Sequence, residues 1–97
     1  MDKKKLIYSI LKELEQGNVP EREDYELRIE QWGEIVLLIK NEGYATGIAV
    51  AFGDNTIAEV SISSAKITMK GIEFLEENSG LAKTYKGIKE VRDWFKL

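Results

Sequence analysis

The 97-residue sequence contains no cysteine, no histidine and only one proline. Without cysteine and histidine, thiol nucleophiles, imidazole bases and the usual zinc ligands are excluded together. The sequence also lacks a nucleophile elbow, a Walker loop and a glycine-rich dinucleotide motif. Residues 53–56, Gly-Asp-Asn-Thr, lack the alternating acidic residues of a calcium-binding loop. We therefore expect a protein that is not an enzyme, with no catalytic residue, metal site, cofactor or small-molecule ligand.

Long hydrophobic runs are missing as well. The longest apolar stretches, such as Ile35–Ile39, are far too short to span a bilayer, so no membrane association is predicted. Residues 1–17 lack the apolar core of a signal peptide, and together with the absence of cysteine this favours a cytoplasmic location. No linker rich in proline, glycine or serine divides the chain, so a single domain over residues 1–97 is expected.

Apolar residues at helical spacing predict a first helix over residues 3–16, closed by Gly17. The turn at residues 17–20 leads through Pro20 into a short second helix over Glu21–Glu26. A third helix is predicted from Ile29 to Glu42, ending at Gly43. The stripe expected to face the core in this third helix consists of Trp32, Ile35, Val36 and Ile39.

After Gly43 the pattern changes to a period of two, which predicts a strand from Tyr44 to Phe52 with one bulky face and one small face. Residues 53–55 turn the chain, and Thr56–Ile62 forms the returning strand of a β-hairpin.

The stretch from Ala65 to Asn78 joins the end of a strand to a fourth helix. Thr68 is expected to cap this helix, and Gly71 is explained by the close approach of another backbone. A fifth amphipathic helix is predicted over Leu81–Lys96. The predicted fold is therefore α+β and mostly α: a winged helix-turn-helix with three N-terminal helices, a hairpin wing over residues 44–62 and two C-terminal helices.

Three segments of the chain carry a resemblance to a known family: Lys40-Asn41-Glu42-Gly43-Tyr44, the run Ile67–Leu75, and the run Tyr85–Trp94. Together they look like the YjcQ family of small bacterial and prophage proteins, and the part from Thr68 onward is the most specific. The resemblance implies a winged-helix architecture and a phage or prophage origin. It implies no established activity and brings no catalytic residue.

The charge distribution disfavours DNA as the partner. Residues 18–44 carry seven acidic and three basic side chains, a net charge of −4, and residues 45–65 carry two acidic and no basic side chains. These segments hold the helix and the wing that would meet DNA in a winged helix, where affinity comes largely from Lys and Arg on phosphates. Residues 81–97 carry five basic and two acidic side chains. This basic segment is a solvated helix face, a contact for the acidic region of another copy, or a nucleic-acid surface.

Candidate contact residues follow from the helical geometry of residues 29–42. With the stripe turned inward, the opposite face carries Glu30, Gly33, Glu34, Leu37 and Asn41. The candidates for contact with another protein are Glu30, Glu34, Leu37 and Trp94; Trp94 alternatively covers a flank of the first helix. The candidates for contact with nucleic acid are Arg28, Gln31, Asn41, Lys83 and Lys86.

Two functions remain open at this point. The first is a non-enzymatic adaptor that binds another protein or itself through the face opposite the core stripe. The alternative is a DNA-binding transcriptional regulator that uses helix 29–42 and the 44–62 hairpin. The first is favoured because the outer face of the helix is acidic and partly apolar.

Overall fold

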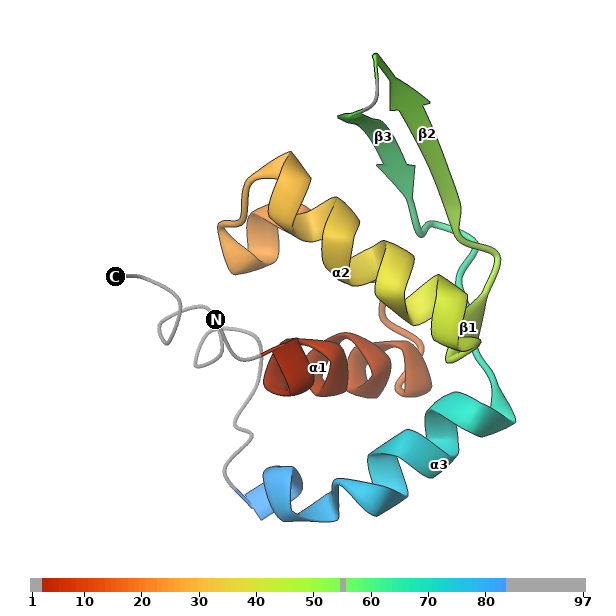
Figure 1. The fold of residues 1–97 in the computed structure, drawn as a ribbon. Coiled ribbons are helices and arrows are strands. Elements are labelled where there is room, and N and C mark those ends of the chain that lie inside the picture. The colour runs from red at the N-terminus through yellow and green to blue at the C-terminus, as the bar shows by residue number, and fades with distance from the viewer. Residues whose placement is uncertain (1–2, 55, 84–97) are drawn as a thin grey trace.

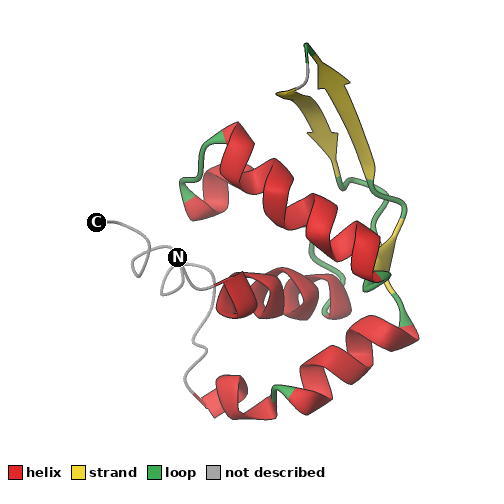
Figure 2. Ribbon diagram, in the orientation of Figure 1, coloured by secondary structure: helices red, strands yellow, loops and turns green. Residues whose placement is uncertain are grey.

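The computed structural model describes residues 3–54 and 56–83 of the chain, where three α-helices pack together and a β-hairpin projects beside them (Figure 1). The α-helices are α1 (Lys3–Glu15), α2 (Ile29–Glu42) and α3 (Met69–Glu77), and the 3-10 helices are η1 (Arg22–Tyr25) and η2 (Ser79–Lys83). The strands are β1 (Ala45–Thr46), β2 (Ala49–Gly53), β3 (Thr56–Ser61) and β4 (Lys66–Ile67). The helices gather at one end of the molecule and the hairpin stands on the α2 side (Figure 2).

Helix α1 lies between the other two α-helices (Figure 1). Its predicted apolar stripe is buried, and Tyr8 and Ser9 are buried too, so that burial continues around the helix over Leu6–Leu11. A buried hydroxyl needs a partner, and the Ser9 hydroxyl lies 2.8 Å from the phenol oxygen of Tyr25 at the end of η1. This hydrogen bond ties the middle of α1 to the turn that precedes α2.

Helix α2 begins and ends where the sequence predicts. Its four stripe residues are all buried, which confirms the orientation inferred from the period of 3.6. The ring of Trp32 stacks on Tyr25 with centroids 5.8 Å apart. The helix closes at Gly43, whose φ of 76° is the left-handed conformation that glycine adopts without steric cost.

The predicted first strand of the hairpin is interrupted at Gly47, whose φ is 76°. A side chain at Gly47 would overlap the carbonyl oxygen of Ser64, so the chain bends there with two backbones in close approach. Two separate antiparallel pairs result. Strand β1 pairs with β4, with Ala45 opposite Ile67, while β2 pairs with β3 from Ala49 opposite Ser61 to Gly53 opposite Thr56.

The joint between the hairpin and α3 agrees with the prediction. The Thr68 hydroxyl accepts a hydrogen bond from the backbone N–H of Gly71 at 3.1 Å and donates one to the carbonyl oxygen of Gly43 at 2.6 Å. A Cβ atom on Gly71 would overlap the carbonyl oxygen of Tyr44, which confirms the close backbone approach. Thr68 therefore connects the start of α3 to the end of α2.

Two of the predicted helices need correction. The segment predicted as a helix over Glu21–Glu26 forms the 3-10 helix η1, because Glu26 adopts a left-handed φ of 54° and leaves room for only one short turn. Leu81 does not begin a new α-helix, since residues 79–83 form η2. The rest of the predicted Leu81–Lys96 helix lies outside the described residues. The coarse class, α+β with an antiparallel hairpin, is as expected, but the described residues contain three α-helices and not five.

Candidate interaction surface

The outer face of α2 holds four of the nine candidate contact residues. Glu30, Glu34 and Asn41 are exposed, and Leu37 is half-buried. The burial of the opposite stripe sets this orientation, since residues on opposite sides of a helix point in opposite directions. Three of the four predicted protein-contact residues therefore lie along one side of one helix.

The hairpin contacts this face along one edge, at Gly33, which the sequence does not predict. Gly33 is buried because the side chain of Ile57 in β3 lies directly on it: a Cβ atom at Gly33 would stand 2.6 Å from Cδ1 of Ile57. Glycine permits this contact because it brings no side chain of its own. A glycine in the middle of a helix is a signal that another group approaches closely. The sequence does not tell which residue approaches, because the contact with Ile57 is tertiary.

A shallow cleft of about 290 Å³ lies where α1, α2 and β3 meet. It is lined by Lys3, Glu34, Leu37, Leu38, Asn41 and Ile57. Two protein-contact candidates and one nucleic-acid candidate thus come together here. The Nζ atom of Lys3 lies 2.7 Å from Oε1 of Glu34 across the cleft, with both side chains more than half exposed. An exposed ion pair of this kind contributes little stability, so both groups can exchange their partner for another.

Arg28 and Gln31, two further nucleic-acid candidates, do not line this cleft. At the other end of α2, Oε1 of Gln31 accepts a hydrogen bond from the backbone N–H of Arg28 at 3.1 Å, so Gln31 serves the start of the helix. Ten residues of helix place Gln31 roughly 15 Å from Asn41. The side chain of Lys83, together with Lys86 and Trp94, lies outside the described part of the structure.

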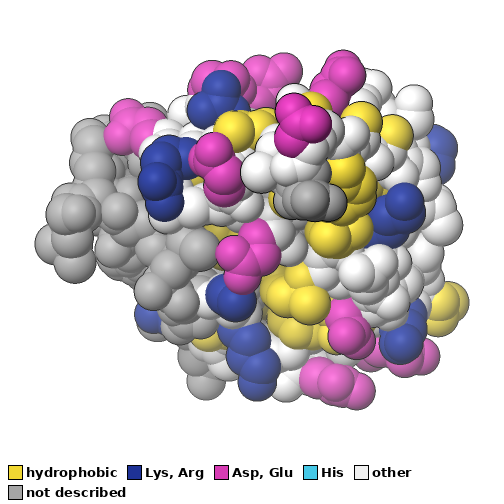
Figure 3. Space-filling view, turned by 45° about the horizontal axis from the view of Figure 1, so that its top comes forward, with side chains coloured by type: hydrophobic (Ala, Val, Ile, Leu, Met, Phe, Trp, Pro, Cys, Tyr) yellow, Lys and Arg dark blue, Asp and Glu magenta, His cyan; other side chains and the backbone are white. Residues whose placement is uncertain are grey.

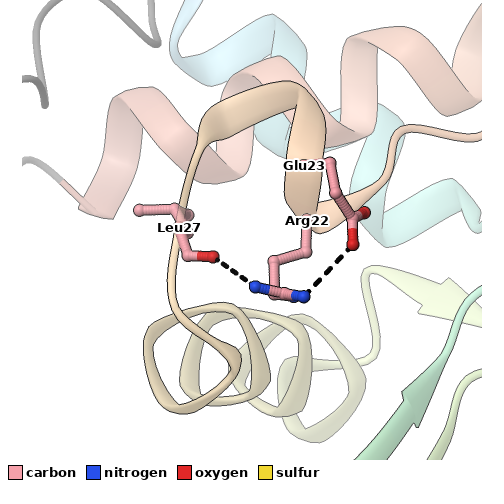
Figure 4. A network of polar contacts seen from close by, with 3 residues as sticks. All are labelled: Arg22, Glu23 and Leu27. Carbon is pink, nitrogen blue, oxygen red and sulfur yellow. Dashed lines mark hydrogen bonds and ion pairs between the residues drawn. The ribbon is translucent and has the colours of Figure 1, made fainter.

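A second groove, of about 430 Å³, runs between η1, the start of α2 and residues 60–63, and Val19 and Pro20 line one of its ends. Arg22 borders it and is held in place: its Nη1 donates to the carbonyl oxygen of Leu27 at 3.0 Å, and its Nη2 lies 3.2 Å from Oε1 of Glu23 (Figure 4). The bond to Leu27 braces the turn between η1 and α2. Arg22 was not among the predicted residues, and the sequence holds no pattern that would have marked it.

The charges on this side of the molecule are mixed. Seen from above the hairpin and α2, acidic and basic side chains are interspersed around a band of hydrophobic ones, without a basic patch that follows a helix or the hairpin (Figure 3). Nucleic-acid binding uses clustered Lys and Arg. Among residues 3–54 and 56–83, no three acidic side chains converge to hold a metal ion. In the same part of the chain, no helix has the length and apolarity needed to cross a membrane.

Comparisons with known proteins give a family and no activity. Residues 8–94 match the family described as YjcQ protein. The chain is 39% identical to the "Uncharacterized protein YjcQ" of Bacillus subtilis (strain 168) over 97 residues, which cover 99% of this chain and 100% of that protein. The search of solved structures returned no match.

Proposed function

This chain belongs to the YjcQ family, and the family match does not name an activity. From the surfaces of the chain itself, we propose that it is a non-enzymatic protein-interaction module. The partner binds at the cleft between α1, α2 and β3, where Glu34 and Leu37 lie beside Ile57. In this role the protein is an adaptor, and we place it in the cytoplasm of a bacterium, with a phage or prophage origin.

The observation that carries the proposal is the contact of Ile57 with Gly33. A helix that reads DNA enters the major groove with its outer face bare, since the groove is only about 12 Å wide. Here β3 packs on one edge of that face at Gly33, and the exposed carboxylates of Glu30 and Glu34 would repel phosphates. A partly apolar cleft with exchangeable charges at its rim fits a protein surface better.

We further propose that the fold is a variant of the winged helix-turn-helix. The order α1, η1, α2, hairpin, α3 follows that of a winged helix with η1 in the place of the short second helix. In this variant the wing lies against α2 through β3. The same contact that makes DNA binding unfavourable holds the wing as one wall of the cleft.

A charge-reversal experiment tests the proposal. The variant Glu30→Lys/Glu34→Lys is compared with the matched control Glu73→Lys/Glu76→Lys, which changes two exposed carboxylates on α3 by the same amount. The immobilised proteins are exposed to a lysate of the encoding organism, and captured proteins are quantified by mass spectrometry. We expect a partner that the wild type and the control retain and the α2 variant loses.

Equal capture by all three proteins would contradict the α2 site. Retention of mixed-sequence duplex DNA by the wild type, weakened by salt and by Arg28→Ala or Asn41→Ala, would favour the regulator instead.

A further inference from the structure

Strand β2 has one edge that no other described strand pairs with. Within residues 3–54 and 56–83 it pairs with β3 alone, and β3 is the strand that packs against α2. The other edge of β2 therefore faces away from the helices, on the outer side of the projecting hairpin (Figure 1). A free edge presents unpaired backbone N–H and C=O groups, which are a template for another strand.

This edge lacks the features that usually prevent strands from associating. The segment from Gly43 to Gly53 contains no charged residue, although 32% of the chain is charged, and no proline. Its flanking charges are Glu42 and Asp54. The bulge of the hairpin, where Ala51 faces Glu59 and Phe52 faces Ile57, places the extra residue Ala58 on β3 and leaves β2 regular.

The sequence of β2 is complementary to itself when two strands run antiparallel about Ala51. In this register Val50 of one copy lies opposite Phe52 of the other. The two-fold axis repeats the pair, so that Phe52 of the first copy lies opposite Val50 of the second. Pairs of an aromatic and a β-branched residue are among the stabilising cross-strand contacts. Phe52 is 59% exposed in the single chain, so the pairing covers an apolar side chain that β3 and α2 leave in water.

The same register avoids electrostatic conflict. It places Asp54 of one copy opposite Ile48 of the other, so that no carboxylate meets a carboxylate although each chain carries a net charge of −3. The small residues Ala49 and Ala51 are exposed on the face of β2 opposite Val50 and Phe52. Their methyl groups are too small to obstruct the second hairpin.

We propose that β2 is a self-association edge at which two copies of this chain join their hairpins into one four-stranded antiparallel sheet centred on Ala51. The partner strand is a second copy of β2, because in this register each strand offers Val50 and Phe52 to the same two residues of the other strand. The inference does not rest on the proposed function, since the α2 cleft takes no part in it.

Crosslinking through a single cysteine tests the register directly. The chain has no cysteine of its own, so Ala51→Cys introduces the only thiol. Directly opposed residues in antiparallel strands have Cα atoms about 4.5 to 5.5 Å apart, within the range of about 4.4 to 6.8 Å that a disulfide spans. Under mild oxidation we expect Ala51→Cys to form a covalent dimer, and the matched control Ala58→Cys on β3 to remain largely monomeric on a non-reducing gel.

Sedimentation over a concentration series tests the association without crosslinking. The wild-type mass should rise from 11.1 kDa toward twice that value as the concentration increases. Ala51→Lys faces Glu59 within its own hairpin, which favours the folded monomer, but brings two lysines together at the two-fold axis. We expect it to raise the dissociation constant at least about tenfold, whereas Ala58→Lys leaves it unchanged.

A wild type that stays monomeric throughout the series overturns the proposal, as does equal crosslinking of the two cysteine variants. Protection of the β2 amides from hydrogen exchange by an added extended peptide, with no change of mass in the absence of the peptide, would show that a foreign strand is the occupant and would also overturn it.

Discussion

Gly71 shows how much one missing side chain decides at the residue scale. A Cβ atom at this position would overlap the carbonyl oxygen of Tyr44, so any other residue there pushes the start of α3 away from the end of α2. Backbone atoms cannot move aside as the end of a flexible side chain can. The contact therefore fixes the distance between the two helices.

We expect Gly71→Ala to destabilise the protein by about 2 kcal/mol, the cost typical of an overpacked site. The melting temperature should fall by roughly 10 °C for a chain of this size. The control is Gly80→Ala, where among the described residues no atom beyond the chain neighbours lies within 4 Å of the new methyl group, and its effect should stay within about 0.5 kcal/mol. Thermal unfolding followed by circular dichroism compares them, and similar melting temperatures for the two variants would contradict this explanation.

Tyr44 is expected to make the stability of the fold depend on pH in the alkaline range. Burial raises the pKa of its phenol, and the nearby carboxylates of Glu42 and Glu77 raise it further. The folded protein therefore keeps the phenol proton at a pH where the unfolded chain, with an ordinary pKa of about 10, has begun to lose it. By linkage, this contribution to stability is complete below about pH 10 and is lost as the pH rises further.

Replacing Tyr44 with Phe removes the titrating group and keeps the ring that packs on Phe74 at 5.0 Å. We expect the free energy of unfolding to fall less steeply for Tyr44→Phe than for the wild type between about pH 9 and 11. Urea unfolding at a series of pH values measures both slopes. All other side chains are the same in both proteins, so only the difference between the slopes is informative, and equal slopes would rule out the role of Tyr44.

At the scale of elements, Thr68 links two helices that are distant in sequence. Thr68→Ala removes the acceptor for Gly71 and the donor to Gly43, and we expect a loss of about 1 kcal/mol or somewhat more. Thr68→Ser keeps the hydroxyl and serves as the control, with most of the stability retained. Chemical denaturation of the three proteins provides the comparison. If Ser were as destabilising as Ala, the methyl group and not the two hydrogen bonds would be responsible.

The packing of the hairpin on α2 can be tested with Gly33→Ala, whose effect on stability should depend on whether Ile57 is present. Gly33→Ala gains roughly 1 kcal/mol of helix propensity but forces Ile57 to move, since its Cδ1 and Cγ2 atoms would lie 2.6 and 2.8 Å from the new methyl group. We expect a net loss of stability in the wild type. In an Ile57→Ala background the space is free, and the same substitution should become neutral or stabilising.

The four proteins form a double-mutant cycle measured by urea denaturation. Coupling between contacting residues is typically about 0.5 to 3 kcal/mol, and additive effects would show that Ile57 does not limit the site.

The elements were predictable from the sequence to different degrees, for physical reasons. Helix α2 has a continuous stripe and a closing glycine, so local signals suffice, and Thr68 and Gly71 are likewise explained by local capping and packing rules. The break at Gly47 was missed because it depends on the carbonyl of Ser64, which only the folded chain brings near. Within the candidate site, Glu34, Leu37 and Asn41 were identified from helical geometry, but the contact of Ile57 is tertiary, and its one local signal is the glycine at position 33 within the helix.

At the scale of the whole molecule, the net charge determines what we expect of binding to nucleic acid. The chain carries a charge of −3, and its acidic residues concentrate in the segment that contains α2. We expect no retention of mixed-sequence duplex DNA even at low salt, where electrostatic attraction is strongest. Fluorescence polarisation with a labelled duplex measures this. Binding that weakens linearly with the logarithm of salt concentration would show that basic residues form a phosphate-binding surface after all.

The short ladder between β1 and β4 has a consequence for how this molecule can change. Thr46 lies opposite Lys66, so the chain leaves the helices and returns to them at one fixed point. Because each doubling of a loop costs only about 0.6 kcal/mol in closure entropy, we expect the turn at residues 53–56 to accept an insertion while this entrance stays in place. Such an insertion leaves the residue Ile57, which packs on Gly33, unchanged.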